Sequence, residues 1–451
     1  MRVPMHAYRR FGALAQHLRP RSPQRALAQQ AAAAADADTE VAQELSVADY
    51  EAAGFDVLRQ ETIVEMASEA TLLRHRATGA EIMSVVNDDE NKSFSALFKT
   101  PPKDSTGIAH ILEHSVLCGS RDYPLKEPFV ELLKSSQQTF LNAMTYPDRT
   151  VYPVASCNLA DFYNLVDVYL NAVFFPRAAE DPLVLAQEGW HYEPAEGEGE
   201  GPLRMSGVVY NEMKGVYSDP DSVMMNVAIQ ALSPDNTYGV DSGGDPAVIP
   251  QLTFDHFRDT WAEWCECPAP PNTHPLCSDS PRPGLADHPS NSRFWFAGND
   301  PPAERLRIIN KYLSEFDARP IDTEIAFQQP MMQPQVVRKG YEVGQEEEGE
   351  EPDSQGRAMV LVSWMLHTSD GGRLDPESSL AFEVLNSALM GTPAAPLRKA
   401  LDDSNLGSQV IGGGLDDDLL QPFFMIGMKG VAEEDEAMQS VQQVVLDVLA
   451  H

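Results

Sequence analysis

The sequence has few basic residues for its length: 33 lysines and arginines face 68 acidic residues, for a formal net charge of −35. This balance argues against nucleic acid as a partner, because phosphate backbones are bound through clustered lysine and arginine. No apolar run reaches the length that a membrane-spanning helix requires. Only 5 cysteines occur in 451 residues, which excludes a disulfide scaffold of the secreted type.

The N-terminal segment differs sharply from the rest of the chain. Residues 1–35 contain no acidic side chain, several arginines and a run of alanines, and the first acid is Asp36. This composition is typical of an organellar transit peptide that is removed from the mature protein, and its low serine content favours the mitochondrial matrix. The body that remains is strongly acidic, so we expect it to attract cationic peptides.

One short motif points to catalysis. The five residues from His110 to His114 read His-Ile-Leu-Glu-His, so on a helix the two histidines project from one face, about one turn apart. Both imidazoles can then reach one metal ion, and Glu113 on the same face can hold a metal-bound water. The order His-x-x-Glu-His is the inverted zinc motif. We expect the helix to begin after an N-cap at Thr106, with an apolar stripe of Ile108, Ile111 and Leu112.

A third zinc ligand must come from another part of the chain, because hydrolytic zinc usually has three protein ligands and one water. Two carboxylates are candidates. Glu212 follows a short apolar run and begins a helical pattern that continues to Leu232, whereas Glu188 lies in the segment Gln-Glu-Gly-Trp. Spacing alone does not choose between them.

Longer motifs accompany the histidine pair along most of the chain. They read Leu-Cys-Gly-Ser at 117–120, Thr-Phe-Leu-Asn-Ala at 139–143, Gln-Glu-Gly-Trp at 187–190, Val-Tyr-Asn-Glu-Met-Lys-Gly at 209–215, Tyr-Gly-Val-Asp-Ser-Gly-Gly-Asp-Pro at 238–246 and His-Pro-Ser-Asn at 288–291. In these motifs the chain resembles the presequence-protease group of the pitrilysin-type zinc metallopeptidases, in its plant and algal organellar form. The resemblance covers nearly everything from the region of Tyr50 to the C-terminus.

The resemblance assigns roles to individual residues. It implies that one zinc ion is held by His110, His114 and Glu212, and that Glu113 is the catalytic base. Glu188 is then expected to support the site from a helix end, outside the ligand set.

Substrate binding is also implied by the resemblance. Asn142 and Ala143 match an edge strand that binds the backbone of an extended peptide. The activity expected is that of a zinc metalloendopeptidase that degrades short unfolded peptides, including cleaved targeting peptides. The mitochondrial matrix, the chloroplast stroma or both are the expected compartments.

The expected fold is α+β, with layers of mainly antiparallel sheet packed against helices, as in the pitrilysin type. We expect a zinc-bearing domain at 36–335, interrupted by an irregular proline-rich insertion at 265–287, then an acidic linker at 336–357. A partial second domain without a zinc motif is expected at 358–451. Its predicted elements are a strand at 358–366, a helix at 379–390 and a strand at 423–430.

The resemblance further implies a later half, beyond His451, that completes a chamber around the peptide. We therefore expect this chain to bind zinc but to have weak or no peptidase activity unless that half is supplied. Two other functions stay open: a non-catalytic scaffold subunit of the pitrilysin type, and a peptidase that cuts presequences from precursors. The intact set of ligand and base residues favours an enzyme over a scaffold, and the long motifs at 209–215 and 238–246 favour the degrading enzyme.

Overall fold

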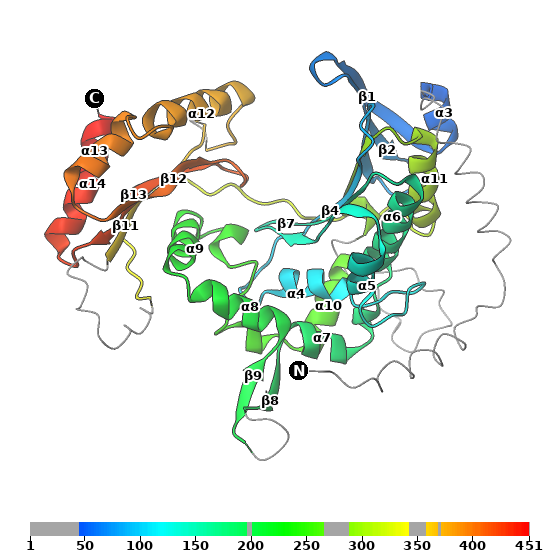
Figure 1. Cartoon of the computed structure of the whole chain (residues 1–451), viewed down its shortest axis with the longest axis horizontal. Helices are drawn as coiled ribbons and strands as arrows, with labels where there is room; N and C mark the ends of the chain where they lie inside the picture. The colour runs from blue at the N-terminus through cyan, green and yellow to red at the C-terminus, as the bar shows by residue number, and fades with distance from the viewer. Residues whose placement is uncertain (1–44, 196–200, 266–287, 342–357, 369–370, 451) are drawn as a thin grey trace, which may run out of the picture.

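The computed structural model describes residues 45–195, 201–265, 288–341, 358–368 and 371–450 (Figure 1). The expected transit peptide at 1–35 lies outside the described residues. So do residues 266–287 of the expected insertion and residues 342–357 of the expected linker.

The larger of two main sheets comes from the N-terminal part of the chain. Its strands lie in the order β1-β2-β3-β10-β4-β7-β5, and β6 pairs with β7 beside β5. The pairs are antiparallel except for β10 with β3. The strands are β1 (Phe55–Ile63), β2 (Ser68–His75), β3 (Glu81–Val86), β4 (Lys92–Lys99), β5 (Gln138–Leu141), β6 (Met144–Thr145), β7 (Arg149–Ser156) and β10 (Ser292–Gly298).

One face of this sheet is buried under helices. Every second residue of β4 is buried, as expected for a strand with one face in a core. The helices α6 (Leu159–Phe174) and α11 (Pro302–Leu313) supply apolar residues to this core, and α3 (Val47–Ala52) packs beside β1. Aromatic pairs join the layers, such as Phe98 and Phe174, whose ring centroids lie 6.0 Å apart in an edge-to-face arrangement.

A second group of helices lies against the β6 end of the sheet. It comprises α4 (Ile108–Val116), α7 (Pro182–Glu188), α8 (Val208–Tyr217), α9 (Pro220–Leu232) and α10 (Phe254–Cys265). The helix α5 (Pro128–Ser135) instead packs against the core of the large sheet through Phe129 and Leu132. The predicted stripe of Ile108, Ile111 and Leu112 is buried in the apolar cluster of this group, which confirms that part of the sequence analysis. The hairpin of β8 (His191–Pro194) and β9 (Leu203–Ser206) projects from these helices (Figure 1).

Two local predictions in this group were wrong. The N-cap of α4 is Gly107, in the left-handed region at φ +70°, because the Thr106 hydroxyl donates to Asp104 and does not cap the helix. The helical pattern from Glu212 to Leu232 is divided between α8 and α9. Asp219 caps α9 by accepting the backbone N–H of Ser222, and proline follows at the first helical position, so a new helix begins there.

Residues 358–450, here called the second unit, build a 3-stranded sheet in the order β11-β13-β12. The predicted strands appear as β11 (Ala358–Met365) and β13 (Phe423–Val431), and the predicted helix as α12 (Pro376–Met390). The remaining elements are β12 (Gln409–Asp416), α13 (Pro396–Ser404) and α14 (Asp435–Leu449). This strand order repeats β4-β7-β5 of the large sheet, and α12 and α13 follow β11 as α4 and α5 follow β4.

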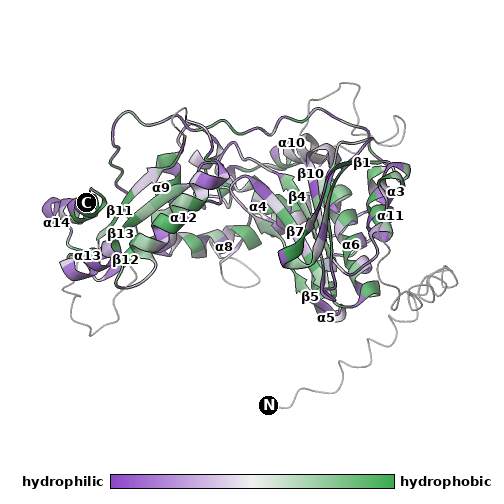
Figure 2. Ribbon diagram, turned by 90° about the horizontal axis from the view of Figure 1, so that it is seen from above, coloured by the Kyte–Doolittle hydropathy of each residue, from purple (hydrophilic) through white to green (hydrophobic). Residues whose placement is uncertain are grey.

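Residues 45–316, here called the first unit, contact the second unit through a small apolar cluster. Tyr238 of the first unit packs there with Leu419, Phe423 and Met425 of the second. An ion pair of 2.9 Å between Lys429 and Asp221 adds a polar contact. Residues 317–341 follow the first unit as a segment without helix or strand. Figure 2 shows the two units side by side, with α9 of the first unit next to β11 of the second.

Short 3₁₀ turns complete the fold at Val64–Met66, Arg177–Ala179, Thr237–Gly239 (η3), Ile249–Gln251 and Pro289–Asn291. Among the described residues, no helix combines the length and the apolar character needed to cross a bilayer.

Candidate metal centre and catalytic site

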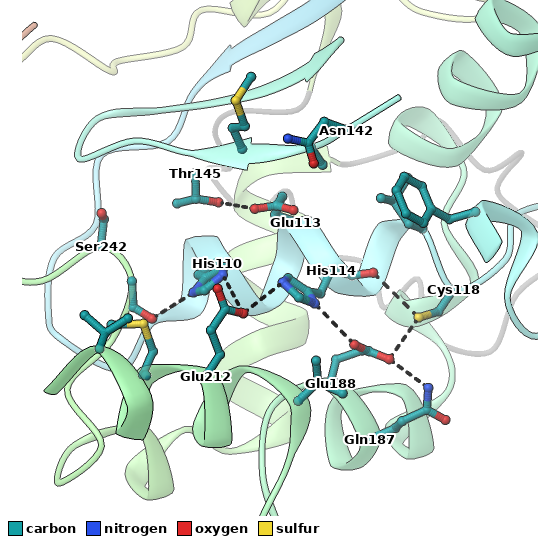
Figure 3. A pocket seen from close by; sticks show the side chains of 18 of the residues that line it. His110, Glu113, His114, Cys118, Asn142, Thr145, Gln187, Glu188, Glu212 and Ser242 are labelled. Atoms are coloured by element: carbon teal, nitrogen blue, oxygen red, sulfur yellow. Dashed lines mark hydrogen bonds and ion pairs between the residues drawn. The ribbon is translucent and has the colours of Figure 1, made fainter. Parts of the chain in front are cut away.

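The helix α4 lies between the sheet and the helices α7 and α8, and it brings the motif residues to a cavity. His110 and Glu113 are buried, and His114 is half-buried. Their helix is held by the apolar side that packs on α7, α8 and α10. The opposite, polar side therefore faces the cavity in a fixed orientation (Figure 3).

Three side chains converge on one point. The Nε2 atoms of His110 and His114 each lie 3.7 Å from the same oxygen, Oε2 of Glu212 on α8. One ligand atom from each of these residues lies within 4.8 Å of the other two. Within the part of the chain that the structure describes, this is the one group of three or more histidine, cysteine, aspartate or glutamate side chains placed to hold a metal ion.

The outer ring nitrogens of both histidines have partners of their own. Nδ1 of His110 donates to the backbone carbonyl of Gly243 at 3.1 Å. Nδ1 of His114 lies 3.4 Å from Oε2 of Glu188. With the Nδ1 atoms engaged in this way, both rings present Nε2 to the shared point, which is the orientation metal-binding histidines need.

The structure thus distinguishes the two carboxylates, Glu188 and Glu212, between which the sequence spacing did not choose. Glu212 lies inside the cluster, whereas Glu188 lies on the other side of the His114 ring (Figure 3). Glu188 is buried and accepts hydrogen bonds from Gln187 at 2.7 Å and from the Cys118 thiol at 3.3 Å.

The electrostatics of His114 and Glu188 are those of a hydrogen-bonded pair. Burial acts to lower the pKa of His114, but the hydrogen bond to Glu188 and the surrounding carboxylates outweigh it and raise the pKa. Burial acts to raise the pKa of Glu188, but hydrogen bonds from His114, Gln187 and Cys118 outweigh it and lower the pKa. Glu188 is therefore a carboxylate at neutral pH, able to orient His114.

Glu113 points from α4 toward the sheet. Its Oε2 accepts a hydrogen bond of 2.9 Å from the hydroxyl of Thr145, the last residue of β6. Burial raises the pKa of Glu113, against the opposing effect of the two histidines and of the Thr145 hydrogen bond. A buried carboxyl beside a cluster of candidate metal ligands is suited to accept and return a proton.

The cluster fits zinc by its donors and by its dimensions. Two imidazoles and one carboxylate form a ligand set typical of catalytic zinc, with a fourth position left for water. Ligand atoms on tetrahedral zinc lie about 3.3–3.5 Å apart, since the bonds are about 2.0–2.2 Å long. The observed 3.7 Å from each histidine to Glu212 is close to that spacing.

The cavity in front of the cluster has a volume of about 850 Å³. Asn142 and Ala143, the expected peptide-binding residues, line it together with Thr145. They lie between β5 and β6 at the edge of the sheet, and Asn142 donates its backbone N–H to Pro153 of β7 at 3.2 Å. None of the described residues that line this cavity is lysine or arginine, whereas Glu127, Glu188 and Asp241 add carboxylates to the motif residues.

Sequence reasoning missed several residues of this site. Thr145, Gly243, Gln187 and Cys118 contact the motif residues or Glu188, yet none was assigned a role. Gly243 lies in the segment 241–245, which the sequence marked only as part of a longer motif. The glycine pair in that segment could have indicated the contact, because glycine often marks a place where the backbone closely approaches another element.

The fold and the site together define a class: an α+β protein whose inverted histidine–glutamate motif meets a distant carboxylate. Comparisons with known proteins agree with this class. Residues 100–184 match the family described as Insulinase (Peptidase family M16), and residues 288–451 match the Peptidase M16 inactive domain.

Curated relatives carry the comparison further. The chain is 49% identical over 401 residues to Presequence protease 1, chloroplastic/mitochondrial, of Arabidopsis thaliana, covering 88% of this chain and 34% of that protein. It is 36% identical over 403 residues to the mitochondrial presequence protease of Danio rerio, covering 88% of this chain and 36% of that protein. The chain belongs to the pitrilysin, or M16, family of peptidases. It spans about a third of the length of these relatives.

Solved structures agree on the fold. Pitrilysin superposes with a TM-score of 0.53 at 16% identity, covering 88% of this chain and 37% of that chain. A protease from Helicobacter pylori gives 0.53 at 15% identity, covering 83% of this chain and 77% of that chain. The predicted α+β fold of pitrilysin type is confirmed.

Proposed function

We propose that this chain carries the catalytic site of a zinc metalloendopeptidase that degrades short unfolded peptides, including cleaved organellar targeting peptides. The observation that carries the proposal is the convergence of His110, His114 and Glu212 within 4.8 Å. Glu113 stands on the same helix as the two histidines, held by Thr145. Similarity to the presequence proteases of Arabidopsis thaliana and Danio rerio supports the choice of substrate class.

The side chains divide the chemistry among them. His110, His114 and Glu212 would hold the zinc ion, and Glu188 orients His114. Bound zinc would lower the pKa of a coordinated water and polarise the scissile carbonyl. Glu113 accepts a proton from the attacking water and returns it to the amine that leaves.

The edge of the large sheet offers a place for the substrate backbone. Asn142 and Ala143 stand at this edge and line the cavity. An extended peptide added there is held by main-chain hydrogen bonds, which require little of its sequence. The carboxylates of the cavity and the net charge of −35 favour cationic peptides.

We further propose the arrangement of the whole chain that the sequence suggested. A zinc-bearing domain at 36–335 and a second, zinc-free domain at 358–451 are supported by the repeated strand order β4-β7-β5 and β11-β13-β12. A mitochondrial or chloroplast location is supported by the names of the relatives and by the arginine-rich residues 1–35. Because the relatives are about three times as long, full turnover is expected only when a later region completes the chamber.

Metal analysis of the purified chain tests the proposal most directly. We expect one zinc ion per chain after dialysis against micromolar zinc, and a loss of that ion in the double variant His110→Ala/His114→Ala. Cleavage of a quenched cationic peptide is then measured with the chain alone and with the C-terminal region of the Arabidopsis thaliana relative supplied in trans. A folded chain that stays metal-free when zinc is offered contradicts the proposal.

A non-catalytic scaffold is the second candidate, because residues 288–451 match a domain described as inactive. The two functions differ in their response to Glu113→Gln. A peptidase loses turnover in that variant, whereas a scaffold binds its partner proteins as tightly as before.

A further inference from the structure

We propose that the loop between β12 and β13 of the second unit positions the catalytic base Glu113, acting through Tyr238 and the turn between β6 and β7. The loop comprises residues 417–422. This inference rests on the proposed function, since it concerns the base of that reaction. It gives the zinc-free unit a task at the site of the other unit.

The proposed effect follows a path of contacts from Glu113 to the loop. The path begins at the hydrogen bond of 2.9 Å from the Thr145 hydroxyl to Glu113 (Figure 3). Thr145 closes β6, where it pairs with Thr150 of β7. The turn between these strands is tight, because the backbone N–H of Tyr146 donates to the carbonyl of Arg149 at 2.8 Å. The position of this turn therefore sets the position of the Thr145 hydroxyl.

The second step joins the turn to η3. The hydroxyl of Tyr238 donates to Oδ2 of Asp148 at 2.7 Å. The same hydroxyl accepts the backbone N–H of Leu420 at 3.2 Å. Tyr238 is almost wholly buried, so water does not replace either partner easily. A single hydroxyl thus links the turn of the first unit to the loop of the second.

Arg149 makes the same connection independently. Its guanidinium donates to the carbonyl of Asp418 at 3.2 Å and to Asp148 at 2.9 Å. It also lies over the ring of Tyr146, 4.4 Å from the ring centroid. Asp148, the last residue of the turn, therefore reaches the loop through Tyr238, whereas Arg149, the first residue of β7, contacts the loop directly.

The loop is itself firmly seated. Gln421 accepts the backbone N–H of Gln328 at 2.7 Å and donates to the carbonyls of Gln328 and Gly371 at 3.1 and 3.3 Å. Leu419 and Phe423 are buried in the cluster around Tyr238. A loop fixed on both sides can hold the turn against α4, and a loop pulled away would release it.

The residues expected to bind the peptide backbone are anchored elsewhere. Asn142 is held by Pro153 of β7 and by the Tyr169 hydroxyl of α6, which donates to its carbonyl at 3.2 Å. Neither contact involves the turn or the second unit. Disturbing the path should therefore lower kcat and leave KM nearly unchanged, a division that a general loss of structure would not produce.

The test compares Tyr238→Phe with Lys429→Gln. The first variant keeps the ring and removes the linking hydroxyl. The second breaks the ion pair to Asp221, a contact between the units that does not touch the turn. Hydrogen exchange of residues 144–151 is measured on the chain itself, so this readout does not depend on turnover. We expect faster exchange there in Tyr238→Phe and Arg149→Met, and no change in Lys429→Gln.

Kinetics complete the test, with the C-terminal region supplied as above. We expect kcat to fall about 10-fold in Tyr238→Phe at constant zinc content, because a small displacement of a catalytic group is costly. Thr145→Val should lower kcat at least as much, whereas Thr145→Ser keeps the hydroxyl and should have nearly the kcat of the unaltered protein. When Tyr238→Phe is combined with Thr145→Val, kcat should fall little further than in Thr145→Val alone.

Three outcomes overturn the positioning role. The exchange of residues 144–151 could stay unchanged in Tyr238→Phe and Arg149→Met, or it could rise equally in Lys429→Gln. The losses of kcat could also add up when Tyr238→Phe is combined with Thr145→Val. Absence of zinc from the unaltered chain, or absence of turnover when the C-terminal region is supplied, would instead contradict the proposed function, while the exchange result would still stand on its own.

Discussion

Glu188 and Glu212 lie on opposite sides of the His114 ring, one 3.4 Å from Nδ1 and the other 3.7 Å from Nε2. In the proposed function, the first orients the ring and the second would bind the same zinc ion as the ring. Carboxylates that hold a metal-binding histidine from outside commonly contribute 10–100-fold to metal affinity. We therefore expect Glu188→Ala to weaken zinc binding by about 10–100-fold, whereas Glu212→Ala removes a ligand and weakens it more.

Titration of the metal-free chain with zinc checks this order. Glu127→Gln is the matched control, because Glu127 lines the same cavity without an ion pair to either histidine. Equal affinities for Glu188→Ala and the unaltered chain would contradict the orienting role.

Glu113→Gln separates metal binding from proton transfer. The amide has nearly the size of the carboxylate and can still accept from Thr145, but it cannot take a proton from water. We expect zinc content to stay the same and peptide turnover to fall by about 100-fold or more, the usual contribution of a positioned base. Turnover is measured under conditions in which the unaltered chain cleaves. Comparable rates in the two proteins would show that another group is the base.

The local parts of the site could be predicted from the sequence, and the distant parts could not. The histidine pair and the apolar stripe of α4 follow from a period of 3.6 residues within one helix. Thr145 lies 32 residues from Glu113, and Gly243 lies 133 residues from His110. Their contacts depend on how the sheet, α4 and the loop after η3 pack together, which no local pattern encodes.

The choice between Glu188 and Glu212 shows the same limit. Both residues lie in helices near α4, and both approach His114. Only their positions on different sides of one ring distinguish the proposed ligand from the proposed support. The wrong N-cap at Thr106 has a related cause: Asp104, two residues earlier, competes for its hydroxyl, and Gly107 supplies the left-handed turn.

His288 should make stability depend on pH. Burial, helped by the charge of Arg319, lowers its pKa to about 4. Its Nδ1 accepts the backbone N–H of Ser290, which a protonated ring could not do. Between the unfolded value of about 6.5 and about 4, the unfolded chain binds more protons than the folded one, so stability falls as the pH falls. The slope contributed by this residue is at most about 1.4 kcal/mol per pH unit.

Urea unfolding of the metal-free chain at pH 7, 5.5 and 4.5 measures that slope, with the pH values chosen across this window. His288→Asn keeps a side-chain acceptor at the cap but does not titrate there. It should be less stable than the unaltered chain at pH 7 and lose less on acidification. All other titrating groups are common to the two proteins, so the difference between the slopes reports His288. Identical slopes would show that the ring is not buried as a neutral base.

Gly244 should be required for the geometry of His110. Its backbone is in the left-handed region at φ +103°, and an added Cβ would meet the Cα of Gly107 at 2.8 Å and Ile249 at 2.9 Å. Alanine there should cost backbone strain of about 1 kcal/mol and a clash besides, pushing the segment at 243–244 away from α4. Since the carbonyl of Gly243 accepts from His110, the displacement should also weaken zinc binding.

Gly79→Ala is the control that isolates backbone strain, because the φ of Gly79 is +80° and nothing lies within 4 Å of the added Cβ. We expect Gly79→Ala to lower the free energy of unfolding modestly and leave zinc affinity unchanged, whereas Gly244→Ala lowers both. Equal zinc affinity in the two variants would mean that the carbonyl of Gly243 does not orient His110.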